Sequence, residues 1–305
     1  MTAIRPAAVA TTERTATTRT GHDDSGTVVT SYKDAQTQTV FAGGVDFAYR
    51  ELGPKTGVPV IFLTHLAAVL DNWDPRVVDG IAAHHRVIAF DNRGVGASSG
   101  STPKTIEAMA NDAVAFMRAL GFENVDLIGF SMGGMIAQVI AANEPQLVRR
   151  LILAGTGPAG GEGITNLTRL SHLDTLRGLL TLQDPKQFLF FTRTPAGRRA
   201  GKEFLARLKE RTANRDKAIS VRSYLAQLTA IHRWGKQQPA DLSVIRQPVL
   251  VANGESDRMV PTKNTIDLAQ RLSNADLVVY PDAGHGGIFQ FHDQFVDKAL
   301  DFLEQ

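Results

Sequence analysis

Three residues of this chain have the types and the order that acyl transfer through a serine requires: Ser131, Asp257 and His285. A serine hydroxyl is a poor nucleophile at neutral pH, so a histidine must take its proton as attack occurs. A carboxylate is needed to hold that imidazole in the right tautomer and to stabilise the imidazolium. The three residues therefore predict a catalytic triad that works through a covalent acyl-enzyme.

The stretch Val125–Pro145 contains the local structure that would expose Ser131. Val125–Phe130 is an apolar run of strand length, and the chain then turns through Gly129-Phe130-Ser131-Met132-Gly133. Apolar residues follow at helical spacing, namely Met135, Ile136, Val139 and Ile140. A strand, a glycine-flanked serine and a helix form a nucleophile elbow, in which the strained turn lifts the hydroxyl above the sheet edge. The start of the helix offers free N–H groups to a developing oxyanion.

A second stretch, Gly96-Ala97-Ser98-Ser99-Gly100, matches the same Gly-x-Ser-x-Gly pattern. It follows the loop DNRGVG and precedes a polar Ser-Thr-Pro stretch, with no strand directly before it and no helix directly after it. Because the pattern exposes a nucleophile only in a strand–turn–helix context, we interpret Ser98 as a loop residue and Ser131 as the nucleophile.

Strands alternate with helices on both sides of the elbow, which predicts an α/β fold with a mostly parallel central sheet flanked by helices. A hairpin joined at Gly43-Gly44 comes first. The expected strands are Thr37–Ala42, Val45–Leu52, Pro59–Thr64, Arg86–Phe90, Val125–Phe130, Arg150–Ala154, Pro248–Asn253 and Leu277–Tyr280. The expected helices of this layer are Val77–Ala83, Thr105–Leu120, the Ser131 helix, Thr262–Leu272 and Asp293–Leu303.

The alternation stops between Gly155 and Leu242, where no buried strand is evident. Helical stretches replace it at Leu167–Leu182, Pro185–Phe191, Ala196–Ala213 and Ala218–Trp234. We therefore expect three parts: a disordered N-terminal tail (1–36), an α/β core (37–156 and 241–305) and an inserted all-helical cap (157–240). Residues 161–240 contain 15 Lys and Arg against 6 Asp and Glu. That excess is typical of solvated helix faces, and it also suits a lid that attracts anionic or electron-rich substrates.

Functional groups of an open parallel sheet collect at the carboxyl ends of its strands. Ser131 follows the strand Val125–Phe130, Asp257 lies in the loop after PVLVAN, and His285 lies in the loop after LVVY. Two backbone N–H groups are the expected oxyanion donors: that of Met132, one residue past the nucleophile, and that of Leu66, in the loop after PVIFLT.

Other titratable residues fit these roles less well. Asp282 is three residues from His285 but lies before the loop turns, so Asp257 is the preferred orienting acid. His65 follows the strand PVIFLT and so lies at the carboxyl edge of the sheet, where the catalytic residues are expected. We assign it a structural hydrogen bond rather than the role of base. His65, His84 and His85 do not have the spacing of a metal site. We expect no metal and no cofactor.

These motifs resemble the α/β-hydrolase fold family, in its serine-nucleophile branch with a helical cap, over roughly residues 38–305. The resemblance is carried by GFSMGG at 129–134, DNRGVGAS at 91–98, the Asp257 loop and GHGG at 284–287. It implies esterase, lactonase or cofactor-free haloperoxidase-like (perhydrolase) chemistry, and the serine sets the chain apart from the branches that use aspartate as nucleophile. The family usually shows His-Gly before its oxyanion loop, whereas this chain has His65-Leu66.

The composition excludes several other classes. The 305 residues contain no cysteine, so disulfides, thiolate metal sites and cysteine nucleophiles are excluded. No apolar run has the length of a membrane span, and the N-terminus lacks the apolar region of a signal peptide. A net charge of +2 gives no sign of a nucleic-acid partner. We expect a cytoplasmic enzyme for a small molecule, with no nucleic-acid or membrane partner, and the sequence carries no signal for the oligomeric state.

The sequence leaves three functions open. The first is hydrolysis of a carboxylic ester or lactone of a small hydrophobic substrate through a Ser131 acyl-enzyme. The second uses the same triad for peracid formation or for cleaving a C–C or amide bond. The third, from another class, is a low-turnover ligand receptor on the same fold. Apolar residues near the expected site are the candidate pocket walls, with Trp73, Phe130, Trp234 and Ile288 as the predicted substrate-binding set beside Leu66 and Met132.

Overall fold

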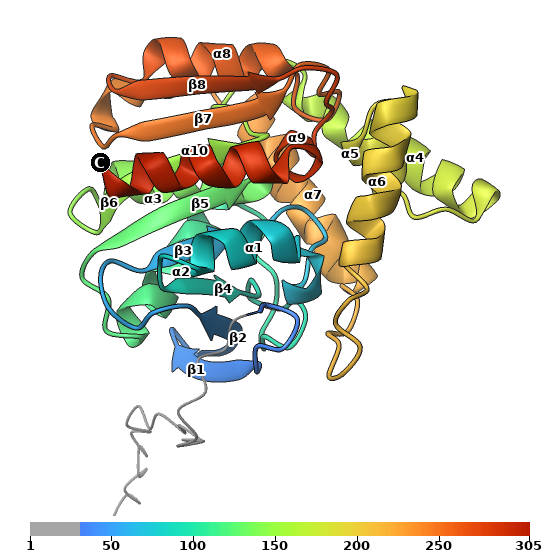
Figure 1. Ribbon diagram of the computed structural model, residues 1–305. Helices are drawn as coiled ribbons and strands as arrows, with labels where there is room; N and C mark the ends of the chain where they lie inside the picture. The colour runs from blue at the N-terminus through green and yellow to red at the C-terminus, as the bar shows by residue number, and fades with distance from the viewer. Residues whose placement is uncertain (1–30) are drawn as a thin grey trace, which may run out of the picture.

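A computed structural model describes residues 31–305 and shows an eight-stranded sheet in the order β1-β2-β4-β3-β5-β6-β7-β8 (Figure 1). The hairpin β1 (Gln38–Ala42) and β2 (Val45–Leu52) is antiparallel, and β2 also runs antiparallel to β4. All other neighbours are parallel. The remaining strands are β3 (Val60–Leu63), β4 (Val87–Phe90), β5 (Val125–Phe130), β6 (Val148–Ala154), β7 (Val249–Gly254) and β8 (Ala275–Tyr280). This confirms the predicted α/β class and each predicted strand, with ends that differ by a few residues.

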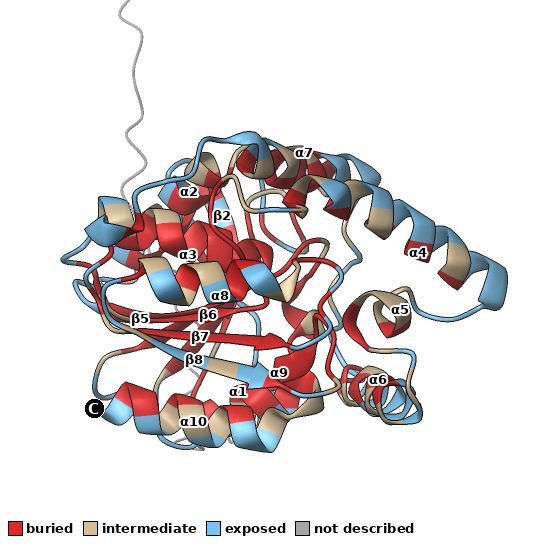
Figure 2. Cartoon of the chain, turned by 90° about the horizontal axis from the view of Figure 1, so that it is seen from above, coloured by how far each residue is buried: buried red, intermediate tan, exposed pale blue. Residues whose placement is uncertain are grey.

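Helices cover both faces of the sheet. One face carries α2 (Ile106–Ala119), α3 (Met132–Asn143) and α8 (Thr262–Arg271), and the other carries α1 (Pro75–Ala82) and α10 (His292–Glu304). Figure 2 shows the buried strands between these two layers. Every residue of β3, β4, β5 and β7 is buried, which explains why these strands read as continuous apolar runs rather than alternating ones.

The segment between β6 and β7 is helical, as the sequence predicts. It contains α4 (Leu167–Thr181), α5 (Lys186–Phe190), α6 (Pro195–Arg207) and α7 (Val221–Lys236), with the short turn η2 (Ile164–Asn166) before them. Figure 1 shows these helices gathered on one side of the molecule, beyond the ends of the central strands. Short helical turns that the sequence analysis did not predict are η1 (Leu70–Asn72), η3 (Leu242–Val244) and α9 (Gly287–Gln290).

A buried ion-pair network attaches this helical segment to the sheet. The guanidinium of Arg50, on β2, is fully buried and donates to Asp71 Oδ1 at 2.8 Å and to Asp216 Oδ2 at 2.9 Å. The backbone amides of Asp71 and Asp216 each donate to the other's carboxylate, both at 2.9 Å. Because Asp216 precedes α7 and Asp71 lies in the loop after β3, the network fixes the helical segment against that loop.

Residues 31–36 correct the predicted extent of the disordered tail. Tyr32 and Ala35 are buried against the core, and the hydroxyl of Tyr32 donates to Leu70 O at 2.9 Å. The amide of Tyr32 donates to Asp79 Oδ1 at 2.6 Å. An aromatic ring with a satisfied hydroxyl offsets the entropy of ordering a short polar segment, which is why these residues pack. The rest of the predicted tail, residues 1–30, lies outside the described residues.

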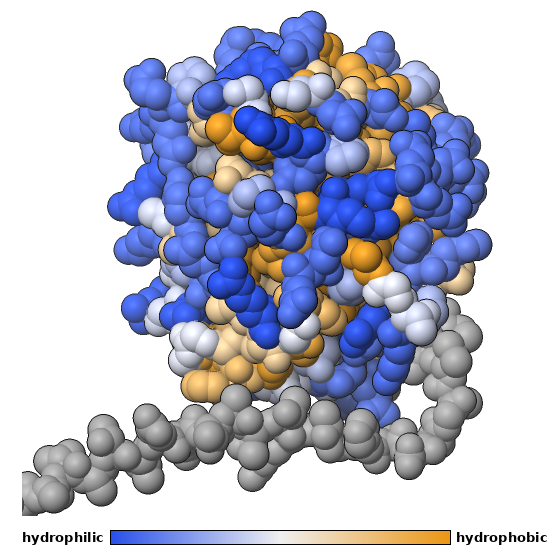
Figure 3. All heavy atoms as spheres, turned by 90° about the vertical axis from the view of Figure 1, so that its left-hand side faces the viewer, coloured by the Kyte–Doolittle hydropathy of each residue, from blue (hydrophilic) through white to orange (hydrophobic). Residues whose placement is uncertain are grey.

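The surface turned away from α4–α7 is shown in Figure 3, where hydrophilic side chains predominate and smaller hydrophobic areas lie between them. No helix within residues 31–305 combines the length and the apolar character that crossing a membrane would need.

Candidate active site

Ser131 lies at the junction of β5 and α3, as the sequence predicts. Its φ of 56° falls in the left-handed region, and its amide donates to Ala154 O on the neighbouring strand at 2.8 Å. A Cβ at position 133 would overlap the backbone of Leu63, and one at position 129 would lie 2.5 Å from Gly133 O. The two glycines are therefore required by the close approach of β3, β5 and α3, and they permit the strained serine between them.

His285 and Asp257 form a buried pair. The distance from His285 Nδ1 to Asp257 Oδ2 is 2.7 Å, and both side chains are almost completely excluded from solvent. The other carboxylate oxygen of Asp257 accepts the amides of Met259 and Val260, at 2.7 and 3.1 Å. Since Asp257 Oδ2 accepts from Nδ1–H, the imidazole keeps Nε2 as its free basic nitrogen.

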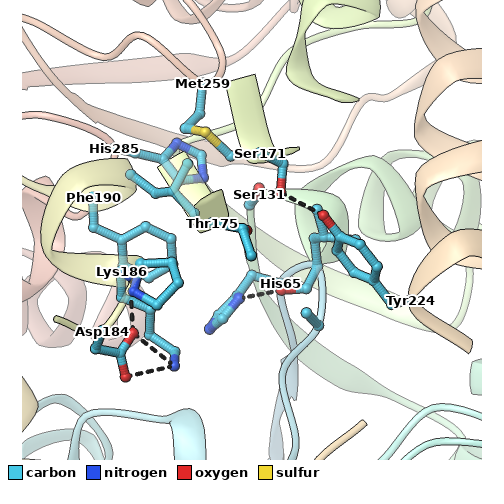
Figure 4. Close-up of a pocket in the computed structure, with 14 residues that line it drawn as sticks. His65, Ser131, Ser171, Thr175, Asp184, Lys186, Phe190, Tyr224, Met259 and His285 are labelled. Atoms are coloured by element: carbon cyan, nitrogen blue, oxygen red, sulfur yellow. Dashed lines mark hydrogen bonds and ion pairs between the residues drawn. The ribbon is translucent and has the colours of Figure 1, made fainter. Parts of the chain in front are cut away.

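Ser131 and His285 line the same cavity, although no hydrogen bond joins Ser131 Oγ to another described residue (Figure 4). Catalytic hydrogen bonds are often long in the absence of substrate and tighten only when substrate binds. The structure thus brings the three sequence-predicted residues to one sheet edge, with the His–Asp contact formed and the Ser–His contact open.

The two predicted oxyanion donors lie beside Ser131. Met132 is the first residue of α3, so its N–H has no partner in the helical ladder, and the N–H of Leu66 likewise meets no acceptor within residues 31–305. Leu66 lines the cavity, whereas Met132 is fully buried beneath it. Ala67, the next residue in the loop, has a φ of 63° and also lines the cavity.

The cavity has a volume of about 160 Å³. The loop after β3, Ser131 and the His285 loop form one wall, and α4, α5 and α7 form the other. The residues contributed by the helical segment are Ser171, Thr175, Asp184, Pro185, Lys186, Leu189, Phe190 and Tyr224. Met259, two residues after Asp257, completes the lining.

The predicted substrate-binding residues require correction, because Trp73, Phe130, Trp234 and Ile288 are absent from this lining. All four are buried in the core. The indole of Trp73 packs edge-on against Phe62, and that of Trp234 donates to Gly157 O at 3.2 Å. Phe130 supports the site from below, with its ring 5.0 Å from that of His285. Burial of large apolar side chains stabilises the fold, and these four side chains pack in the core instead of lining the cavity.

Phe190 is an aromatic residue of the site that the sequence analysis missed. It lies at the end of α5, with its ring 5.4 Å from that of His285 and 5.1 Å from that of His65. Its carbonyl accepts the amide of Gly286, next to His285, at 2.8 Å. A short helix rich in Phe and Leu in the cap region was the one available signal, and it did not reveal which side chain turns inward.

His65 has the structural hydrogen bond that the sequence analysis assigned to it. Its Nδ1 donates to Leu66 O at 2.8 Å, and burial lowers the pKa of His65 to about 3, against the opposing effect of that hydrogen bond. The imidazole is therefore neutral at physiological pH and is suited to holding the loop rather than to accepting a proton.

Acid should destabilise the protein through His65. The unfolded chain takes up a proton near the ordinary histidine pKa of about 6.5, whereas folded His65 stays neutral down to about pH 3. The free energy of unfolding should therefore fall as the pH is lowered from about 7 to about 4. His65→Asn keeps a donor for Leu66 O without titrating, so its urea-unfolding free energy should fall less over this range. If the unfolding free energies of the native chain and of His65→Asn fell equally with pH, His65 would not be the source of the acid sensitivity.

The alternative serine and carboxylate have structural partners. Ser98 is buried, its hydroxyl donates to Asp91 O at 2.7 Å, and its Oγ accepts the amide of Ala48 at 2.9 Å. Asp282 accepts the hydroxyls of Thr192 and Thr194, at 3.1 and 2.9 Å, so it attaches the start of α6 to the core. Within residues 31–305, no three His, Asp or Glu side chains gather as a metal site would require.

Residues 58–291 match the model of the alpha/beta hydrolase fold family. The chain belongs to this family. A solved alpha/beta hydrolase fold protein from Chitinophaga pinensis is 38% identical with a TM-score of 0.86, over 90% of this chain and 99% of that one. The 2-hydroxy-6-oxononadienedioate/2-hydroxy-6-oxononatrienedioate hydrolase of Paraburkholderia phymatum is 30% identical over 236 residues, 75% of this chain and 81% of that protein.

A third relative is Est816, described as an N-acyl homoserine lactone degrading enzyme. It is 26% identical with a TM-score of 0.69, over 87% of this chain and 99% of that one. The alpha/beta hydrolase family and its relatives named as hydrolases or degrading enzymes identify this chain as a hydrolase. The family resemblance read from the motifs is confirmed.

Proposed function

We propose that this hydrolase cleaves small carboxylic esters or lactones through a Ser131 acyl-enzyme. The observation that supports the proposal is that Ser131 and His285 line the same cavity. Ser131 lies at the tip of a strained strand–helix turn, and His285 Nδ1 is 2.7 Å from Asp257 Oδ2. Such an arrangement supplies a nucleophile, a base and an orienting acid to one bound acyl group.

The reaction follows from these positions. His285 Nε2 takes the Ser131 proton as Oγ attacks the carbonyl carbon, and the negative charge develops on the carbonyl oxygen near the Met132 and Leu66 amides. The proton then passes to the leaving alcohol, and a water molecule releases the acid by the reverse sequence. In a lactone the leaving alcohol remains attached to the acyl chain, so one hydroxy acid is the product.

The segment 157–240 acts in this proposal as the cap that closes the cavity. Its helices contribute eight of the lining residues, including Leu189 and Phe190 as apolar walls. Cavities of about 150 Å³ hold a benzene-sized molecule. A volume of about 160 Å³ therefore suits an acyl group of a few carbon atoms. The description of Est816 as a lactone-degrading enzyme supports including lactones among the test substrates.

The acyl-length profile tests the proposal. With p-nitrophenyl esters, kcat/KM should be highest for acetate to hexanoate and at least about tenfold lower for laurate, because a long chain exceeds the cavity. Leu189→Ala enlarges the cavity and should move the optimum to longer chains. Leu173→Ala, on the outward side of α4, is the matched control and should leave the profile unchanged.

Three other results of these ester assays would contradict the proposal. Preference for laurate in the native chain, or equal profiles for Leu189→Ala and Leu173→Ala, would contradict the role given to the cavity. If the native chain is inert on every ester and lactone, ester hydrolysis is wrong. Peracid formation, C–C or amide cleavage, and ligand binding without turnover are then the remaining hypotheses.

A further inference from the structure

The peptide group between Leu66 and Ala67 is held at both ends. His65 Nδ1 donates to its carbonyl, Leu66 O, at 2.8 Å, a bond drawn as the dashed line from His65 in Figure 4. Its amide, Ala67 N–H, donates to Gln227 Oε1, also at 2.8 Å. A peptide group is planar, so two hydrogen bonds on opposite edges fix its orientation. We call this pair of contacts the peptide clamp.

Gln227 reaches this loop from another part of the fold. It lies on α7, in the helical segment, 160 positions away from Ala67 in the chain. Its side chain is fully buried and lies outside the cavity lining. The contact therefore joins the helical segment directly to the loop that follows β3.

The amide of Gln227 is only half satisfied. Because a backbone N–H can only donate, Oε1 must face Ala67, and Nε2 is then left buried with no acceptor within residues 31–305. A buried unpaired donor costs free energy, so a glutamine placed only for stability is a poor choice here. Gln247 also has a buried unpaired amide atom, so the contact with Ala67 N–H, rather than the unpaired donor alone, indicates a role beyond packing.

The clamp acts on the loop at a strained position. Ala67 has a φ of 63°, which is uncommon for a residue with a side chain, so this conformation needs support from its surroundings. The clamped peptide adjoins Leu66, whose own N–H meets no acceptor within residues 31–305 and is the predicted oxyanion donor of this loop. The peptide plane that carries the Leu66 N–H meets the clamped plane at Leu66 Cα, so a shift of the loop on release of the clamp would also displace that N–H from the developing oxyanion.

We propose that Gln227 is a positioning residue that, from α7, holds the Leu66 amide in place for the transition state. The proposal rests on the function proposed above, because it requires an oxyanion at Leu66 N–H. Its consequence is that the helical segment supports the chemical step as well as the cavity wall. A purely structural glutamine would instead affect stability and leave the chemical step unchanged.

The test uses Gln227→Met, which has nearly the same length and lacks the amide acceptor, with Gln227→Leu as a second apolar variant. On p-nitrophenyl acetate, kcat should fall about ten- to hundredfold, while KM changes less than about twofold. A misplacement of a catalytic group by about 1 Å can lower the rate by up to about a hundredfold. Inhibition by butaneboronic acid, which forms a tetrahedral adduct, should weaken by the same factor as kcat/KM. Gln227→Glu keeps an acceptor for Ala67 N–H and should recover most of the loss.

Gln247→Leu is the matched control. Gln247 is also a buried glutamine with one unpaired amide atom, Oε1, and its Nε2 donates to Ala141 O at 3.2 Å. It precedes β7, at the end of that strand opposite to the Asp257 loop, and is absent from the cavity lining. This variant should lower the melting temperature without changing kcat. Unchanged kcat or raised kcat in folded Gln227→Met, or equal kcat losses in Gln227→Met and Gln247→Leu, would overturn the positioning role. An inert native chain would instead overturn the proposed function, so the two failures are distinguishable.

Discussion

Ser131→Ala should lower the turnover of p-nitrophenyl acetate by at least about 10⁴-fold, because removing a triad nucleophile leaves only the catalysis due to binding and to the oxyanion donors. The melting temperature should stay close to that of the native chain. Alanine accepts a φ of 56° no worse than serine does, and Ser131 Oγ has no hydrogen-bond partner in the described chain to lose. Steady-state kinetics and thermal unfolding of the purified variant measure both effects.

The matched control for this prediction is Ser98→Ala, which alters the other Gly-x-Ser-x-Gly stretch. Ser98 bonds to Asp91 O and to the amide of Ala48, so this variant should lose stability and keep its kcat. If Ser131→Ala retained a tenth or more of the native turnover, Ser131 would not be the nucleophile. If Ser98→Ala alone lost turnover without unfolding, the assignment of the two serines would be reversed.

Asp257→Asn should lower kcat by about 10⁴-fold with little change in KM. In the native protein, Asp257 Oδ1 accepts two backbone amides and Oδ2 accepts the proton on His285 Nδ1. In the variant, the amide oxygen must face those two backbone donors, so its NH₂ group faces Nδ1. Nδ1 then becomes an acceptor and the proton moves to Nε2, which can no longer accept the proton of Ser131.

Asp282→Asn tests the competing carboxylate three residues before His285. Asp282 accepts two threonine hydroxyls at the start of α6, so its loss should loosen that contact and cost turnover no more than a few-fold. Comparable losses of kcat in Asp257→Asn and Asp282→Asn would mean that Asp257 supports the structure of the site and does not orient His285. A larger loss in Asp282→Asn would transfer the orienting role to Asp282.

The nucleophile elbow could be predicted from sequence because all its signals are local. The apolar run Val125–Phe130, the two glycines and the helical spacing after Ser131 lie within about twenty residues, and the structure places β5 at the predicted ends. Asp257 and His285 were predictable for a related reason: parallel strands bring their carboxyl ends to one edge, so residues distant in sequence meet there.

The cavity walls could not be predicted in the same way. Trp73 and Trp234 are large and apolar, which suits a core position and a pocket wall equally well, and the structure uses both in the core. Which side of α4 or α5 faces the sheet depends on how these helices dock. The inward placement of Phe190 and Lys186 therefore has no local signal.

Short segments without a periodic apolar pattern were the second source of error. Residues 31–36, SYKDAQ, have no apolar periodicity, yet Tyr32 bonds to Leu70 O and Asp79 and packs against the core. The helix Gly287–Gln290 begins with a glycine and has four residues, too few for a periodic pattern to appear. Both segments owe their structure to tertiary contacts rather than to their own sequence.

Trapping the acyl-enzyme would show directly whether Ser131 is the covalent nucleophile. The native chain would be mixed with p-nitrophenyl butyrate, quenched in acid within milliseconds, digested and examined by mass spectrometry. We expect a butyryl mass increase on the peptide that carries Ser131, with a matching burst of p-nitrophenol, and neither signal in Ser131→Ala. Active enzyme with butyryl on another residue, or turnover without a burst or an adduct, would contradict the proposed mechanism.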